Sequence, residues 1–129
     1  MIAAVETTEG VVLVDVEEET LLGPGDALPA VESPPVDLPR VVATAASGST
    51  VVAVVDRRPP LAISNDAGAT WREAGGGLPA GFAIAIAEDD PDRMLFAGRS
   101  RLYLSTNGGT FWRSLALELP DVAGVAWLD

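Results

Sequence analysis

Two stretches of this chain are nearly the same: Ser64-Asn65-Asp66-Ala67-Gly68-Ala69-Thr70-Trp71 and, 41 positions later, Ser105-Thr106-Asn107-Gly108-Gly109-Thr110-Phe111-Trp112. The same offset carries Leu78-Pro79 onto Leu119-Pro120. It also carries the plain apolar run at 42–47 onto 83–88, and that run onto 124–129. Landmarks that share one offset indicate a structural repeat.

The length of the repeat points to a β-propeller, because a period near 40 residues with four short strands is the size of one propeller blade. Alternating apolar residues and turn residues predict the strands of two blades: 41–47, 50–56, 60–65 and 70–75, then 82–88, 93–98, 101–106 and 110–116. Ahead of them, 1–6 and 10–16 are predicted strands, and Leu21-Leu22 begins a short third strand. The intervening Glu17-Glu18-Glu19 is expected to be a solvated turn.

The sequence therefore predicts one all-β domain of three four-stranded antiparallel blades. We expect a first blade at 1–22, a Pro-rich loop at 23–40, a second blade at 41–77 and a third at 78–118. The first blade lacks an inner strand, whereas the predicted strand at 124–129 lacks a blade. Three blades alone would leave sheet edges and apolar faces in water.

These complementary deficits predict a homodimer that closes a six-bladed ring. In this prediction, residues 124–129 of each chain supply the inner strand of the partner's first blade. The rival explanation is that the chain is one part of a longer protein cut at a blade boundary.

The repeated turn carries a motif. Ser64, Asp66, Gly68, Thr70 and Trp71 fit the pattern S-x-D-x-G-x-T-W at every specified position. The second copy is looser and keeps Ser105, Asn107, Gly109 and Trp112. On these motifs the chain resembles the Asp-box, or BNR-repeat, β-propellers, which include sialidases, sortilin-type receptors, xyloglucan-degrading enzymes and photosystem II assembly factors. The resemblance covers 41–129 well and 1–22 weakly.

The boxes are expected to be structural rather than catalytic or calcium-binding. Short Ser and Asp or Asn side chains can accept local backbone N–H groups, and Gly permits a positive φ at the reversal. The Trp of each box is expected to pack between neighbouring blades. In the family that the chain resembles, the boxes lie on the face away from the ligand.

The composition excludes several function classes. Nineteen acidic residues against eight arginines give a formal charge of -11, which opposes binding to nucleic acid and to anionic bilayers. With no His and no Cys, the chain has no thiol chemistry, no imidazole base and no His or Cys metal site, so we expect no metal and no cofactor. No signal peptide or membrane span is recognisable. We expect a cytoplasmic protein, or an extracellular one if the chain is a fragment.

Four arginines form the candidate ligand-binding set. The resemblance implies a ligand face formed by the connections between second and third strands and by those that lead from one blade to the next. The former contain Arg57, Arg58, Arg99 and Arg101 here. Because Arg presents a rigid fork to carboxylates, phosphates and sulfates, an acidic protein segment or an anionic glycan is the expected ligand. Alternatively, these arginines pair with neighbouring acids such as Asp56 and Glu9.

The predicted function is a non-enzymatic binding or assembly module. Family sialidases use three arginines, a Tyr with a neighbouring Glu, and an Asp, but the single Tyr103 is expected far from the ligand face. A sialidase-like glycoside hydrolase or a degenerate relative stays an alternative, since nineteen acids offer many carboxylate pairs. A minimal or engineered self-assembling propeller is the third interpretation.

Overall fold

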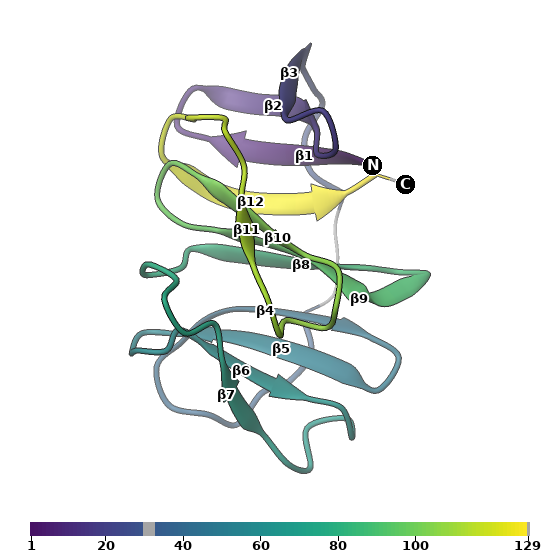
Figure 1. The fold of residues 1–129 in the computed structure, drawn as a ribbon, viewed down its shortest axis with the longest axis vertical. Helices are drawn as coiled ribbons and strands as arrows, with labels where there is room; N and C mark the ends of the chain where they lie inside the picture. Colours follow the sequence, from purple (N-terminus) through teal and green to yellow (C-terminus); the bar gives the residue numbers. More distant parts are fainter. Residues whose placement is uncertain (30–32, 129) are drawn as a thin grey trace.

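The structure, a computed structural model, describes residues 1–29 and 33–128 and confirms the predicted fold class. The strands in this part of the chain form three four-stranded antiparallel sheets, each of which is one blade (Figure 1). It contains no helix that is long and apolar enough to cross a membrane.

The strands of each blade follow one another from the innermost to the outermost. In this order, blade 1 contains β12 (Val122–Trp127), β1 (Ile2–Thr7), β2 (Gly10–Asp15) and β3 (Thr20–Pro24). Blade 2 contains β4 (Val41–Ser47), β5 (Thr50–Val55), β6 (Leu61–Ser64) and β7 (Arg72–Ala74). Blade 3 contains β8 (Ala83–Ala87), β9 (Asp90–Ala97), β10 (Leu102–Ser105) and β11 (Arg113–Ser114).

The middle strands carry the core. Every residue of β5 and β6 is buried, and β-branched residues dominate β5, as expected for strands that are covered on both faces. Apolar side chains of blade 2, including Val52 and Ile63, pack against Phe96 and Met94 of blade 3. The opposite face of blade 3 packs against blade 1.

Blade 3 therefore lies in the middle of the arc, with blade 1 on one side and blade 2 on the other (Figure 1). Each of the two end blades has one face against blade 3. We call the opposite faces the outer face of blade 1 and the outer face of blade 2.

The segment between β3 and β4 covers part of both outer faces. At its start, the Gly25 N–H donates to the Val11 carbonyl at 2.9 Å, and Gly25 lies against Leu13 on the outer face of blade 1. Near its end, Val36 and Leu38 pack on a small buried cluster of blade 2 formed by Ala53, Val55 and Ala62. The chain thus shields its own end faces.

The inner strand of blade 1 is supplied within one chain. β12 pairs with β1 in antiparallel register from Ala3 opposite Trp127, and the Leu128 N–H donates to the Ile2 carbonyl at 2.9 Å. In the structure, pairing within one chain replaces the predicted exchange of residues 124–129 between two chains. The pairing within one chain is possible because β12 follows blade 3 in the sequence and blade 1 packs directly beside blade 3.

The prediction of a solvated Glu17-Glu18-Glu19 turn is wrong for Glu19. Its carboxylate accepts a hydrogen bond from the Ala116 N–H at 2.7 Å and forms an ion pair with Arg113 at 3.2 Å. These contacts join the β2–β3 turn of blade 1 to the outer strand of blade 3. No local pattern in the sequence indicates them, because the two segments are 97 positions apart.

Candidate functional site

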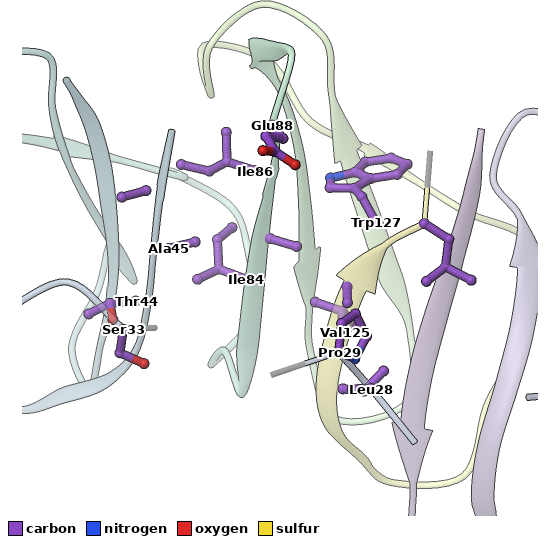
Figure 2. Close-up of a pocket in the computed structure, with 14 residues that line it drawn as sticks. Leu28, Pro29, Ser33, Thr44, Ala45, Ile84, Ile86, Glu88, Val125 and Trp127 are labelled. Carbon is purple, nitrogen blue, oxygen red and sulfur yellow. The ribbon is translucent and has the colours of Figure 1, made fainter. Parts of the chain in front are cut away.

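A hollow lies along the innermost strands of all three blades. It has a volume of about 690 Å³ (Figure 2). Its lining comes from β4, β8, β12, and the flanks of the Pro-rich segment: Leu28, Pro29, Ser33, Thr44, Ala45, Ala46, Ile84, Ala85, Ile86, Glu88, Val125, Ala126, Trp127 and Leu128. We call this hollow the inner cavity.

Most of the side chains that line the inner cavity are apolar. Ile84 and Ile86 of β8 lie in the middle of it, between Thr44 and Ala45 of β4 on one side and Val125 and Trp127 of β12 on the other (Figure 2). Glu88 is the one charged residue among the described lining residues. A hollow of this size, lined by apolar side chains together with polar groups, has the general character of a ligand site.

The side chain of Trp127 contacts Arg93 of β9 in blade 3. The Arg93 guanidinium lies over its ring at 4.6 Å from the ring centroid, a cation–π contact. The indole Nε1 is buried and has no hydrogen-bond partner among the described residues. This stacking fixes the indole as a rigid wall of the inner cavity.

The first Asp box forms a closed set of local hydrogen bonds. The Ser64 hydroxyl donates to Asp66 Oδ1 at 2.7 Å and accepts from the Gly68 N–H at 2.8 Å. The Thr70 N–H donates to Asp66 Oδ1 at 2.8 Å, and the Thr70 hydroxyl donates to Asp66 Oδ2 at 2.5 Å. Led by the Thr70 hydroxyl, these bonds lower the pKa of Asp66 from 3.8 to about 2.

The second box repeats this geometry. The Ser105 hydroxyl donates to Asn107 Oδ1 at 3.0 Å and accepts from the Gly109 N–H at 2.9 Å, while the Phe111 N–H donates to Asn107 Oδ1 at 3.0 Å. Thr110 takes no part in these bonds, since Phe111 occupies the position of Thr70. Both boxes use their polar atoms within the turn, which supports the structural role.

The two box tryptophans differ in position. Trp112 packs at the junction of blades 2 and 3, where it meets Phe96 at 6.0 Å between ring centroids. The prediction that Trp71 also lies between two blades is wrong: it packs on the outer face of blade 2, in the same cluster as Val36 and Leu38. Blade 2 has no blade on that side among the described residues.

The four candidate arginines divide into two pairs. Arg99 forms an exposed ion pair with Asp121 at 3.2 Å, and Arg101 donates to the Leu115 carbonyl at 2.9 Å. Arg57 and Arg58 are exposed and line a hollow of about 110 Å³ together with Val42, Val55, Asp56, Ala80 and Gly81. The first pair thus contacts other groups of the chain, whereas the second pair is exposed to solvent.

The sequence did not predict the inner cavity. Its walls come from three repeats and from the Pro-rich segment, whose path no periodic pattern reveals. Apolar alternation in the innermost strands was the one available signal. Within 1–29 and 33–128, no three Asp or Glu side chains are grouped closely enough to hold a metal ion.

The geometry defines the class of the protein, an arc of β-propeller blades. No family model and no curated protein matches the sequence, so membership of the Asp-box family stays a prediction.

Two solved β-propeller structures resemble the chain. The GH74 enzyme of Niastella koreensis matches with a TM-score of 0.54 and 26% identity, over 92% of this chain and 18% of that one. YCF48 bound to D1 peptide matches with a TM-score of 0.53 and 17% identity, over 92% of this chain and 38% of that one. The chain spans well under two thirds of either neighbour. These likenesses support the propeller fold.

Proposed function

We propose that this chain is a non-enzymatic binding module whose ligand occupies the inner cavity. The observation that carries the proposal is the cavity itself, about 690 Å³ lined by the innermost strands of all three blades. Rigid sheets hold these walls, so a ligand meets a preformed surface and little ordering is needed on binding.

The lining favours an apolar ligand that is neutral or positively charged. Ile84, Ile86, Val125 and Trp127 offer apolar surface, and Glu88 would repel a carboxylate. The formal charge of -11 acts in the same direction. An extended peptide fits best, because β4, β8 and β12 each lie at the edge of their sheet and offer main-chain groups to a strand-like partner.

The test uses a random peptide library selected on the immobilised protein. Ala46→Trp fills the inner cavity from an exposed position of β4, so it leaves the core intact. Ala123→Trp is the matched control, since Ala123 is an exposed residue of β12 that does not line the cavity. Selected peptides should bind the wild type and the control equally, and Ala46→Trp about tenfold more weakly or worse.

Equal binding to all three proteins, or a selection without any enriched peptide, would contradict the proposal. The alternative, a glycoside hydrolase, is favoured by the GH74 neighbour alone. Such enzymes generally use two carboxyl groups that flank the scissile bond, whereas Glu88 is the single carboxylate among the described lining residues. Turnover of a fluorogenic sialoside or glucoside by the purified protein would support the glycoside hydrolase and contradict the non-enzymatic binding module.

A further inference from the structure

The three innermost strands differ in how open they are. None of the seven residues of β4 is buried, whereas four of the five residues of β8 are buried. On β12, Gly124 lies under Leu28 of the Pro-rich segment, since a Cβ on this glycine would come within 2.9 Å of Leu28 Cδ1. The inner edge of β4 is therefore more open than the inner edges of β8 and β12.

The hairpin between β4 and β5 decides which main-chain groups of β4 point to this open edge. Gly48, with a φ of 60°, starts a two-residue turn, so Ser47 and Thr50, which flank the turn, are a hydrogen-bonded pair. Hydrogen-bonded and non-hydrogen-bonded pairs alternate along an antiparallel ladder. Thr44 and Ala46 therefore fall at non-bonded positions, and their N–H and C=O groups point away from β5.

The main-chain groups of Thr44 and Ala46 are available to a partner. Thr44 is half-buried, Ala46 is exposed, and both residues line the inner cavity. Within residues 1–29 and 33–128, neither residue makes a main-chain hydrogen bond outside the strand ladder. Two donors and two acceptors thus face the inner cavity from an unpaired sheet edge, which is a template for an added strand.

An acidic side chain lies at one end of this edge. The hydroxyl of Ser47, the last residue of β4, donates to the Glu88 carbonyl at 3.0 Å. The side chain of Glu88 is exposed and lines the inner cavity, beyond Ile84 and Ile86 of the same strand segment (Figure 2). A strand that lies along β4 would therefore meet a negative charge near Ser47 and apolar side chains along the rest of its length.

We propose that the ligand of the inner cavity is an extended segment that adds a strand to β4 and carries a Lys or Arg beside Glu88. This inference rests on the proposed function and names the edge and the chemistry of the partner. The main chain of the segment pairs with Thr44 and Ala46. Because side chains alternate along a strand, every second side chain of the segment lies on the side of Ile84 and Ile86.

The first test takes a peptide selected on the wild type and methylates its main-chain amides one at a time. A methyl group removes the donor and stands between the two paired edges. Binding should therefore fall about tenfold at every second amide, whereas the amides between them point away from β4 and should tolerate the change. A loss that does not alternate, or no loss at any amide, would overturn the addition of a strand.

Ala46→Pro shows whether β4 is the edge that is used. Proline removes the N–H of residue 46, which β5 does not use, so the ladder between β4 and β5 is kept. Ala46→Val is the matched control, because it adds similar bulk and keeps the N–H. Ala46→Pro should bind the peptide about tenfold more weakly than Ala46→Val does. Equal binding to the two variants would overturn the pairing with β4.

Glu88→Gln tests the charge. Replacing the basic residue of the peptide by norleucine should weaken binding about two- to fivefold on the wild type, the range of an exposed ion pair, and should have no effect on Glu88→Gln. Asp89→Asn is the matched control, since Asp89 is exposed and does not line the inner cavity. It should keep the preference for the basic residue. Selected peptides without Lys or Arg would contradict the role of Glu88.

The outcomes separate this inference from the proposed function. A selection without any enriched peptide, or full binding to Ala46→Trp, removes the proposed function and this inference with it. Peptides that Ala46→Trp excludes, but that bind Ala46→Pro and Ala46→Val equally, leave the proposed function in place and overturn the strand on β4 alone.

Discussion

At the scale of single residues, the hydrogen bonds of the two Asp boxes explain why the first box has Asp66 and the second has Asn107. Asp66 uses both carboxylate oxygens, since the Thr70 N–H and the Thr70 hydroxyl bind different ones. Asn107 meets Phe111 at the corresponding position, which offers an N–H and no hydroxyl. One oxygen is then enough, so an amide serves as well as a carboxylate.

The lowered pKa of Asp66 predicts a dependence of stability on pH. A carboxyl whose pKa falls from 3.8 to about 2 on folding stabilises the fold above about pH 4, and this contribution is lost as the pH falls through 2. Asp66→Asn cannot accept the Thr70 hydroxyl at a second oxygen. The variant should be less stable than the wild type at pH 7.

Urea unfolding at several pH values checks this prediction. The difference between the wild type and Asp66→Asn should shrink between pH 4 and 2, since other carboxyl groups titrate equally in both proteins. A difference that stays constant over this range would show that the carboxylate charge does not matter.

The reversal of each box predicts opposite effects at two equivalent positions. Ala67 has a φ of 59°, whereas its counterpart Gly108 has a φ of 73°. Because a left-handed backbone costs a residue with a Cβ roughly 1–2 kcal/mol, Ala67→Gly should stabilise the protein by about 0.5–1 kcal/mol, after the added flexibility of the unfolded chain. Gly108→Ala should destabilise it by about 1 kcal/mol or more. Thermal unfolding measures both, and equal signs would contradict the assignment.

At the scale of elements, the same hairpin has different neighbours in different blades. A Cβ on Gly109 would lie 2.5 Å from Ile63 Cδ1 of blade 2, whereas a Cβ on Gly68 would meet nothing closer than Trp71, at 3.6 Å. The box of blade 3 is locked into a junction, whereas the box of blade 2 borders the Pro-rich segment. The contribution of a box to the stability of the fold therefore depends on whether its blade has a neighbouring blade on that side.

This contrast predicts unequal losses for the two tryptophans. Trp112→Ala removes the contact with Phe96 and the indole hydrogen bond to the Gly109 carbonyl, and should cost about 3 kcal/mol. Trp71→Ala should cost less, about 1–2 kcal/mol, because it leaves both internal junctions intact. Urea unfolding of the two variants measures the difference, and a larger loss for Trp71 would contradict it.

The elements themselves could be predicted from the sequence. The predicted strands at 41–47 and 50–56 agree closely with β4 and β5, because alternation and turn residues are local signals. The order of blades in the arc could not be predicted, nor could the packing of Val36 and Leu38 on blade 2. The inner cavity was missed for the same reason, since it depends on where a non-repeating segment runs.

At the scale of the whole molecule, the Pro-rich segment stabilises an arc whose end faces would otherwise be bare. Leu38→Ser should lower the free energy of unfolding by about 1–2 kcal/mol, since a half-buried apolar contact on blade 2 is lost. Asp37→Ser is the matched control, because Asp37 is exposed in the same segment. Urea unfolding and binding of a hydrophobic dye report the change. Equal unfolding free energies and equal dye binding for the two variants would mean that the Pro-rich segment does not cover the outer face of blade 2.

The pairing of β12 with β1 also sets an order for folding during synthesis. When the ribosome has made β1, β2 and β3, the inner neighbour of β1 does not yet exist. Blades 2 and 3 have all their own strands before β12 emerges, so they can pack on each other first. Blade 1 then closes by a contact across almost the whole described chain, so its first three strands, although translated before blades 2 and 3, are completed after them.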